Sequence, residues 1–502
     1  MHSLDYSDTT KPSLFKKIIP FSPSRAAQYR MKKHYEYFES TVPGFENNRR
    51  RFRYYWNEIT EYCNYFSDDS LSVLEVGCST GDLLAGLKAR RRVGVDFSPG
   101  MIAAAREKYP DIRFEVMEAE TLTFEETFDL IIISNLVGHL EDVQEVFEEL
   151  HRVCHERTKI IITYYNFLWE PILRGAEWLG VKPRTPNQNW LSRGDISNLL
   201  RLAGFDVYRT SSQTLLPVRI PLVSGICNRY IAKLPLFNLL CVNEYVFARP
   251  QIGAADDRSY KKRYSVSVVI PARNESGNIE NALKRMPDFG QELEIIFVEG
   301  NSTDDTWNKI QEAAREYSDT FSIKTLQQDG KGKADAVRKG FEHATGDILM
   351  ILDADLTVPP EDLPKFYDAL ASGKGDFING SRLVYAMEKE AMRSLNLLGN
   401  KFFSVLFSWL LDRPFKDTLC GTKVMFRKDY LRLVKNRSFF GDFDPFGDYD
   451  LIFGAFKLNL KIVELPIRYR ERTYGTTNIS RFKHGLILLK MCAFAARKIK
   501  FV

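Results

Sequence analysis

Two aspartates, Asp353 and Asp355, follow directly on an apolar run in the stretch ILMILDADLTVPP (348–360). The apolar run predicts a buried strand, and burying two like charges at its end would be costly. Because the chain turns at a strand end, both carboxylates can converge on one ion there. Hard oxygen ligands select Mg²⁺ or Mn²⁺, which bind substrate phosphates. The pair therefore predicts a divalent-cation site, with exposed loop acids or a helix cap as the alternative.

Two other strand ends in the same half of the chain carry polar groups. The stretch VSVVIPARNESGN (266–278) leaves a predicted strand near Pro271 and reaches Glu275, and LEIIFVEGNSTDD (293–305) ends a strand on Glu299. Open parallel sheets bind ligands at the carboxyl ends of their strands. The basic loop DGKGKAD adds Lys331 and Lys333, which suit phosphate groups, and a solvated charge run is the alternative.

A second candidate site lies in the first half of the chain. In VLEVGCSTGD (73–82), Gly77 and Gly81 stand between a predicted strand and a helix, where glycine permits a tight turn and close approach of a ligand. The next predicted strand ends on Asp96, which suits ribose hydroxyls. The pattern predicts a nucleoside-containing cofactor, with NAD as one candidate, and a glycine turn without a ligand is the alternative. Beyond the fourth strand, His139 is a candidate general base or a locally bonded loop histidine.

Strand and helix patterns alternate twice along the chain, which predicts an α/β protein with two sheets covered by helices. Predicted strands lie at 73–77, 91–97, 128–134 and 158–165, and again at 264–271, 293–300 and 347–355. The polar stretch 249–263 is typical of a linker. The predicted division is an N-terminal extension (1–50), a first domain (51–217), an apolar segment and linker (218–263), a second domain (264–480) and a basic amphipathic C-terminal helix (481–502).

Composition narrows the class of protein. The 502 residues carry 70 basic and 65 acidic side chains, and a net charge of +5 gives no support to nucleic-acid binding. The seven cysteines form no CxxC pair, which disfavours a disulfide framework or a structural zinc site. We expect no secretory signal and no membrane-spanning helix. Apolar segments with scattered cations at 220–240, 395–412 and 479–502 instead predict peripheral contact with a membrane surface, and core helices are the alternative.

The first half resembles the class I S-adenosylmethionine-dependent methyltransferases. The matching stretches are LEVGCSTGD, VGVDFSPGMIAAARE, FEVMEAETL and FDLIIISNLVGHLEDV. The resemblance implies a Rossmann-like sheet and S-adenosyl-L-methionine as the cofactor. The residues that it places at the cofactor are Glu75, Gly77, Gly81, Asp96, Glu118, Ala119 and Asn135.

The second half resembles family-2 glycosyltransferases of the GT-A fold, specifically the dolichyl- and polyprenyl-phosphate sugar transferases. The matching stretches are VVIPARNE, VEGNSTDDT, GKGKADAVRKG and LDADLTVPPEDL. The resemblance implies a mixed sheet, a nucleotide-sugar donor and a metal held by Asp353 and Asp355. Residues expected at the nucleotide sugar are Pro271, Ala272, Arg273, Glu275, Glu299, Lys331, Lys333, Asp353, Ala354, Asp355 and Arg472. Further candidates are Arg382, Asp448 and Asp450 for catalysis and Arg393 and Asn396 for an acceptor phosphate.

Three positions depart from that family pattern. The two-acid turn of the relatives is EGNS here, with Gly300 in place of the second acid. Thr357 stands where relatives often carry a glutamine ligand, and Asn478 stands where a lysine is usual. The first departure leaves the nucleotide base open, and the second leaves the third protein ligand of the ion open.

The sequence thus predicts a bifunctional enzyme that acts peripherally on the cytoplasmic face of a membrane. One domain would transfer a sugar from a nucleotide donor to a polyprenyl or dolichyl phosphate, and the other would methylate a glycan or lipid-linked acceptor. Two alternatives stay open. The sugar acceptor could be a saccharide hydroxyl, with Asp448 or Asp450 as base, or the first domain could bind S-adenosylmethionine without catalysis.

Overall fold

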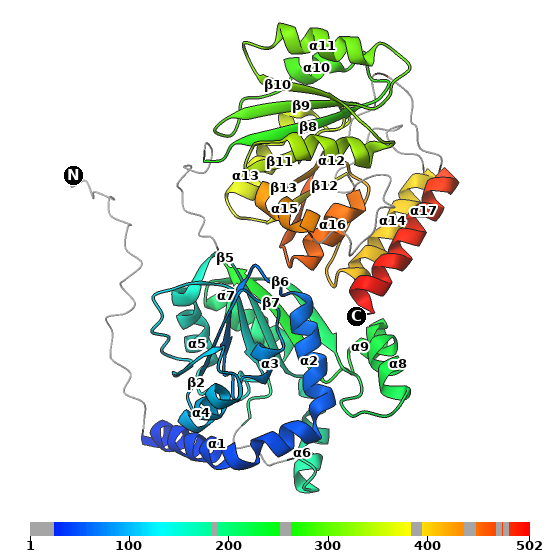
Figure 1. Cartoon of the computed structure of the whole chain (residues 1–502). Helices are drawn as coiled ribbons and strands as arrows, with labels where there is room; N and C mark the ends of the chain where they lie inside the picture. The colour runs from blue at the N-terminus through cyan, green and yellow to red at the C-terminus, as the bar shows by residue number, and fades with distance from the viewer. Residues whose placement is uncertain are drawn as a thin grey trace, which may run out of the picture.

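The computed structural model describes residues 25–182, 188–251, 263–382, 394–435, 448–467, 474 and 481–501. Within these residues the chain forms two seven-stranded sheets, each packed against helices (Figure 1). The elements of the first half are α1 (Arg25–Arg51), α2 (Arg53–Tyr65), β1 (Ser72–Val76), α3 (Asp82–Ala85), β2 (Arg91–Asp96), α4 (Pro99–Lys108), β3 (Arg113–Val116), β4 (Phe128–Ser134), α5 (Val143–Glu149), β5 (Cys154–Tyr165), η3 (Phe167–Trp169), α6 (Glu170–Trp178), α7 (Arg193–Leu202), β6 (Phe205–Gln213), α8 (Val223–Arg229), η4 (Ile231–Lys233), α9 (Pro235–Asn238) and β7 (Asn243–Pro250).

The elements of the second half follow the same alternation at first. They are β8 (Val266–Ala272), α10 (Ile279–Lys284), β9 (Leu293–Glu299), α11 (Thr306–Glu316), β10 (Ser322–Gln327), α12 (Lys333–His343), β11 (Ile348–Ile351), α13 (Leu363–Ala371), β12 (Phe377–Ser381), α14 (Ser394–Leu410), β13 (Lys423–Phe426), α15 (Arg427–Lys435), α16 (Asp448–Lys457), β14 (Ile462–Pro466) and α17 (Arg481–Ala495). The predicted strands are all present, which confirms the α/β architecture with two sheets.

The first sheet has the strand order β3-β2-β1-β4-β5-β7-β6. Its first five strands are parallel, as the alternating pattern predicts. The central strand β1 is buried along its whole length, because helices cover both faces of a parallel sheet. The parallel part places the carboxyl ends of β1, β2 and β4 at one edge, where the glycine turn and Asp96 lie.

Strand β7 lies inside the segment that the sequence analysis treats as apolar segment and linker. It pairs antiparallel with β5 on one side and with β6 on the other, and all eight of its residues are buried. The first sheet therefore continues to Pro250, past the domain end expected at residue 217. Strand β7 is identified by its pairing with β5 and β6, because its short sequence shows no clear alternation of polar and apolar residues. The remainder of the predicted linker, residues 252–262, lies outside the described residues.

The second sheet has the order β10-β9-β8-β11-β13-β12-β14. Strands β10, β9, β8 and β11 are parallel, whereas β13 runs antiparallel to both β11 and β12. This confirms the predicted mixed sheet. The carboxyl ends of β9, β8 and β11 meet at one edge, which brings the three polar strand ends of the sequence analysis together.

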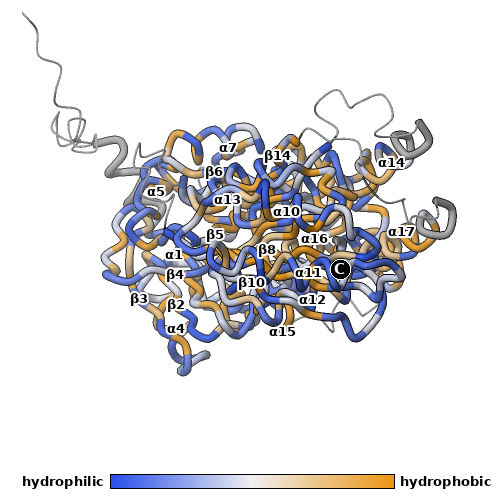
Figure 2. The backbone as a smooth tube through the Cα atoms, turned by 90° about the horizontal axis from the view of Figure 1, so that it is seen from above, coloured by the Kyte–Doolittle hydropathy of each residue, from blue (hydrophilic) through white to orange (hydrophobic). Residues whose placement is uncertain are grey.

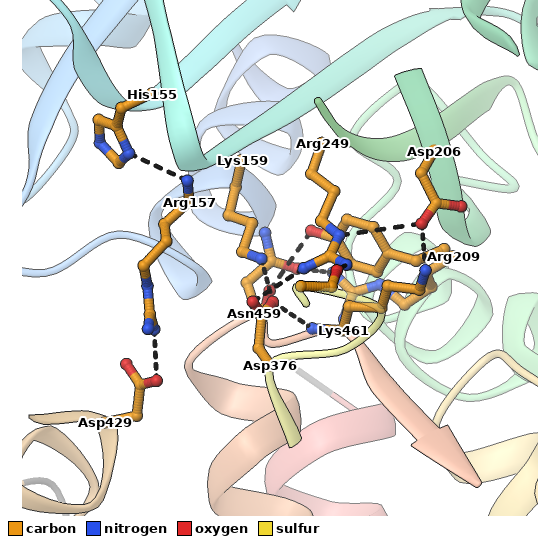
Figure 3. A network of polar contacts seen from close by, with 12 residues as sticks. His155, Arg157, Lys159, Asp206, Arg209, Arg249, Asp376, Asp429, Asn459 and Lys461 are labelled. Carbon is orange, nitrogen blue, oxygen red and sulfur yellow. Dashed lines mark hydrogen bonds and ion pairs between the residues drawn. The ribbon is translucent and has the colours of Figure 1, made fainter. Parts of the chain in front are cut away.

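The two halves meet across a buried polar interface (Figure 3). Asp376, which precedes β12, forms an ion pair with Lys159 of β5 and one with Arg249 of β7, the latter at 2.9 Å. Asp376 is 4% exposed and Arg249 is 2% exposed. Burial alone would raise the pKa of the Asp376 carboxyl, but the adjacent cations outweigh it and hold that pKa well below its usual range.

Flanking contacts extend this interface in both directions. Arg157 pairs with the buried Asp429 of α15, and Asp206 pairs with Lys461. The guanidinium of Arg209 lies 3.6 Å from the ring centroid of Phe247 and 4.6 Å from that of Phe456, so it stacks on an aromatic ring from each half. Arg209 also donates to Asn459 Oδ1 at 2.8 Å. The ionic and stacking contacts fix the two sheets relative to one another.

Candidate active sites

The turn after β1 needs its two glycines. Gly77 and Gly81 have φ angles of 77° and 76°, in the left-handed region. A Cβ on Gly81 would lie 2.4 Å from the Phe114 ring. The amides of Gly77 and Cys78 both donate to Val95 O of the neighbouring strand. The turn is therefore held tightly against β2, with its backbone open to a ligand as the sequence analysis expects.

Asp96 ends β2 and lies at the base of a large cavity. Its carboxylate accepts hydrogen bonds from Ser79 N at 2.9 Å and from Ser98 N at 3.0 Å. Burial raises the pKa of Asp96, and the two backbone donors oppose that effect. Each carboxylate oxygen has a second lone pair, so Asp96 can bind the turn and accept from ribose hydroxyls at the same time.

The cavity has a volume of about 1170 Å³ and is lined by residues from both ends of the first half. Five of the seven predicted cofactor residues line it: Gly77, Asp96, Glu118, Ala119 and Asn135. Asn135 has a φ of 52°, and its Oδ1 is buried without a hydrogen-bond partner among the described residues. An acid beside a glycine turn and a buried amide oxygen that lacks a donor are suited to the ribose and amino groups of S-adenosylmethionine.

Glu75 and Gly81 do not line the cavity. Burial raises the pKa of Glu75 to about 8, although the charge of Arg49 and the Leu84 amide oppose the shift. Its position beneath the turn favours a role in holding the turn, and contact with the cofactor stays a prediction. His139 does line the cavity, and its ring meets that of Phe38 edge-on at 5.5 Å. Its role as a base stays a hypothesis.

Helices α1 and α2 supply a cavity wall that the sequence analysis did not predict. Aromatic side chains from these two helices face the cofactor turn across the cavity; they are Tyr35, Tyr37, Phe38, Phe45, Phe52, Tyr55 and Trp56. Glu39 of α1 accepts from Ser98 Oγ at 2.5 Å and from Gly100 N at 3.3 Å, which ties α1 to the start of α4. The aromatic residues recur at spacings of three, four and seven residues, a helical period that could have revealed this wall.

The second site begins where β8, β9 and β11 end. Each strand is followed by a non-glycine residue in the left-handed region: Asn274, Asn301 and Leu356, with φ angles of 58°, 57° and 50°. Non-glycine residues in this conformation occur most often at functional sites, and the surrounding contacts must hold the backbone there. Here the loops enforce one another, since Asn274 N donates to Ser302 Oγ and Thr303 N donates to Asn274 Oδ1.

The two predicted glutamates at this edge are buried and hold the loops. Glu299 accepts from Ser302 N at 2.5 Å, and Glu275 accepts from Asn278 Nδ2 at 2.7 Å. Tyr474, two residues after the predicted donor residue Arg472, lies 3.0 Å from Ser276 Oγ through its hydroxyl. Tyr474 therefore reaches the loop that follows β8.

Asp353 and Asp355 lie just beyond β11 and have different partners. Asp353 Oδ1 is 2.6 Å from Lys333 Nζ, at the start of α12. Asp355 Oδ1 accepts from both the amide and the hydroxyl of Thr357. Thr357 stands where relatives often have a metal-binding glutamine, and here it fixes the second aspartate in place. Of the two predicted lysines, Lys333 therefore contacts the aspartate pair, whereas Lys331 is exposed.

A divalent cation fits this donor set. Mg²⁺ and Mn²⁺ need only one or two carboxylates when substrate phosphates and waters complete the shell. Among the described residues no group of three or more His, Cys, Asp or Glu side chains forms a closed metal cage. The Asp353 carboxylate already binds one positive charge, the ammonium group of Lys333. A Cβ on Gly421 would lie 2.0 Å from Asp353 Oδ2, so this glycine, not noted in the sequence analysis, keeps the site accessible.

The remaining predicted residues are distributed around this edge. Arg382 forms a bidentate pair with the fully buried Asp417, at 2.7 and 2.8 Å. Asp450 pairs with Arg338 at 2.8 Å. Pro271 and Ala272 end β8, Arg273 follows them and is exposed, and Ala354 is buried between the two aspartates. Arg393 and Arg472 lie outside the described residues, as do the side chains of Asp448 and Asn396.

Comparisons with known proteins agree with both halves. Residues 267–435 match the model of glycosyl transferase family 2, and residues 73–157 match that of a methyltransferase domain. A dolichol-phosphate mannosyltransferase of Pyrococcus furiosus is 40% identical over 219 residues, which are 43% of this chain and 59% of that protein. An undecaprenyl-phosphate 4-deoxy-4-formamido-L-arabinose transferase of Klebsiella pneumoniae is 34% identical over 228 residues, 44% of this chain and 64% of that protein.

The chain spans about three fifths of the length of these two relatives. Glycosyltransferase AglJ of Haloferax volcanii is 27% identical over 226 residues, 45% of this chain and 69% of that protein. All three similarities cover less than half of this chain, as expected if one domain carries them. The chain therefore joins a methyltransferase domain to a glycosyltransferase family 2 domain.

Proposed function

We propose that the second domain transfers a sugar from a nucleotide donor to a polyprenyl or dolichyl phosphate, and that the first methylates an acceptor from S-adenosylmethionine. The observation that carries the glycosyltransferase proposal is the pair of aspartates at the end of β11, with Lys333 against Asp353. The names of the relatives, two of which act on lipid phosphates, support the acceptor class. The donor loops after β8 and β9 border the same edge.

The chemistry follows from the charges at this edge. An acceptor phosphate oxygen would bond to the anomeric carbon while the bond from that carbon to the nucleoside diphosphate breaks, and the electron pair would leave with the diphosphate. A cation held by Asp353 and Asp355 would neutralise charge on that leaving group. Lys333 is placed to add a second positive charge. A lipid phosphate is already ionised near neutral pH, so the reaction needs no strong base.

A saccharide hydroxyl is the weaker alternative acceptor. That reaction needs a general base, which the sequence analysis assigns to Asp448 or Asp450. The Asp450 carboxylate is paired with Arg338, and a cation beside a carboxylate makes it a poorer base. This pairing favours the lipid phosphate.

Peripheral attachment to a membrane is part of the proposal. Among the described residues no helix is long and apolar enough to cross a bilayer. Helices α14 and α17 contact each other, carry hydrophobic residues and lie at the edge of the molecule (Figure 2). Phe402, Val405 and Leu486 are exposed on them. Because nucleotide sugars and S-adenosylmethionine are made in the cytoplasm, we place the enzyme on the cytoplasmic face.

One experiment tests the glycosyl transfer directly. The purified full chain would be incubated with Mn²⁺, a panel of nucleotide sugars and a short polyprenyl phosphate, and lipid-linked sugar would be detected by mass spectrometry. We expect a single sugar to be transferred, and the product to be lost with EDTA. Transfer to a saccharide in the absence of any lipid product would reject the lipid acceptor.

A further inference from the structure

The cavity of the first domain is larger than one cofactor requires. Cofactor and ligand sites commonly span about 300–1,000 Å³, and this cavity measures about 1170 Å³. Its cofactor end carries Asp96 and Asn135. The rest of the wall is mainly aromatic and aliphatic, with Trp169, Ile172 and Leu173 among the lining residues. The cavity therefore has room for an acceptor whose contacts are largely apolar.

One part of the cavity mouth is apolar, whereas Glu118, Glu141 and Asn189 are exposed lining residues elsewhere. Three aliphatic residues both line the cavity and are exposed to solvent: Ile172, Val181 and Val218, at 57%, 43% and 50%. We name these three residues the apolar rim. Exposed aliphatic residues at a cavity mouth would hinder a hydrated sugar, because entry would remove its water without replacing the hydrogen bonds.

The rim continues into a larger exposed surface on α8 and α9, which we name the apolar shelf. It consists of Leu222, Ile226, Leu236, Phe237, Leu239 and Leu240. Trp169 Nε1 donates to Leu240 O at 2.8 Å, and Asn166 Nδ2 donates to Leu239 O at 2.9 Å. These bonds tie the residues leading into α6 to the end of the shelf. Rim and shelf are thus joined through the residues that lead into α6, which carries Ile172 of the rim.

Two exposed cations, Arg219 and Arg229, lie in the stretch that carries the shelf. Residues 214–243 contain Arg219, Arg229 and Lys233 but no aspartate or glutamate. Arg229 and Tyr230 of α8 contact Phe501, beyond α17, so the shelf lies next to the C-terminal end of the second domain. An exposed apolar surface with two exposed arginines matches an anionic lipid surface. A contiguous patch of this kind is uncommon on a monomeric protein without a partner.

Resting on the proposed methyl transfer, we propose that the methyl acceptor is an amphiphile with an isoprenoid-type chain, which enters from a membrane across the shelf and the rim. Its polar end would reach the cofactor. There an acceptor atom would form a bond to the methyl carbon as the carbon–sulfur bond breaks, and the electron pair would stay on sulfur. The acceptor would release one proton. The apolar chain would lie along Ile172 and Val218.

The test uses the full chain with S-adenosylhomocysteine and a farnesyl phosphate that carries a diazirine at its far end. The probe would be presented in phosphatidylcholine–phosphatidylglycerol vesicles, and labelled peptides would be identified by mass spectrometry. We expect labelling of peptides that contain Ile172, Val181 or Val218. The double variant Ile172→Glu/Val218→Glu should reduce this labelling at least 5-fold while its affinity for S-adenosylmethionine, measured by calorimetry, stays the same.

Leu202→Glu is the matched control, because Leu202 is equally exposed on α7 and does not line the cavity. It should label like the wild type. Labelling confined to residues 264–480 would overturn the inference and leave the proposed glycosyl transfer intact. A dimer that dissociates in the double variant, seen by light scattering, would also overturn it, because a second copy would then cover the rim. A wild-type chain that binds no S-adenosylmethionine would instead overturn the proposed methyltransferase function.

Discussion

The two candidate sites are built in opposite ways. The first is a deep cavity whose walls come from α1, α2 and α6 as well as from the sheet. The second is an edge where the loops after β8 and β9 hold one another and Lys333 faces the Asp353 carboxylate after β11. In the first domain the shape of the binding site is prepared in advance. In the second, the charge arrangement is prepared in advance, and the substrate phosphates and the cation must complete the site.

The largest expected effect comes from the charge-based site. Asp355→Ala should reduce glycosyl transfer by about 10³-fold or more, because the cation would lose one of its two protein carboxylates. Methyl transfer should be unchanged. Both rates would be measured on one preparation with labelled sugar and labelled methyl donors. Asp319→Ala, at an exposed acid of the same domain, is the control. Loss of both activities would show that the domains do not act independently.

The interface between the sites should dominate stability. Asp376→Asn leaves Lys159 buried without its counter-charge and leaves Arg249 only the longer contact with Asp206 at 3.8 Å, which should cost about 3–5 kcal/mol of unfolding free energy. Scanning calorimetry, together with loss of each activity on heating, would measure the effect. Because the network joins both sheets, we expect both activities to be lost at the same lowered temperature. A shift in only one activity would mean that the interface does not couple the two halves.

A smaller effect is expected at the cavity of the first domain, where the shape of the walls contributes much of the binding. Asp96→Asn should weaken S-adenosylmethionine binding roughly 10- to 100-fold, because a hydrogen bond to a charged acceptor contributes about 1.5–3 kcal/mol. The cavity walls are unaffected, so binding should persist. Calorimetric titration at neutral pH gives the dissociation constant, and glycosyl transfer serves as the internal control. An unchanged affinity would remove Asp96 from the cofactor site.

The smallest effect concerns Glu75 and depends on pH. Its pKa is about 8 in the folded protein and about 4.5 in the unfolded chain, so the folded state keeps a proton that the unfolded state releases. Stability contributed by the protonated form is therefore lost as the pH rises from about 4.5 to 8. Glu75→Gln should be more stable than the wild type at pH 6 by about 2 kcal/mol, because the roughly 1.5 pKa units between 4.5 and 6 count about 1.4 kcal/mol each.

Urea unfolding of the ligand-free chain at pH 4, 5 and 6 would measure this difference. We expect the advantage of Glu75→Gln to vanish near pH 4. A difference that does not change with pH would mean that the carboxyl group does not titrate in this window.

The sequence predicted the parts of both sites that depend on local pattern. The strand periods, the glycine turn before α3 and the acids after β2 and β11 are short-range signals, and the structure has them at the expected strand ends. Strand β7 could not be placed in this way, because its identity as a strand depends on β5 and β6. The wall formed by α1 and α2 was missed although the spacing of its aromatic residues has a helical period, because that period alone does not tell which surface the helices cover.

The sequence also did not show which residues would pair with the predicted site residues. Arg382 was expected to act in catalysis, and nothing in its own stretch indicated that Asp417, 35 residues later, would bind it in two places. Thr357 departs from the family pattern in type, yet its two hydrogen bonds to Asp355 give it a use that spacing could not reveal. Lys333 was predicted as a phosphate ligand, and its pairing with Asp353 adds a link to the cation site.

The polar interface also limits how this protein can be taken apart. A cut within residues 252–262 would leave Arg249 and Lys159 on one fragment and Asp376 on the other, each exposed on a face shaped for its missing counterpart. We therefore expect that neither the methyltransferase domain nor the glycosyltransferase domain can be exchanged without also changing the interface. Replacing one of them with a homologue would require the new domain to supply matching charges, so the pairing of the two enzymes is specified in residues that neither active site uses.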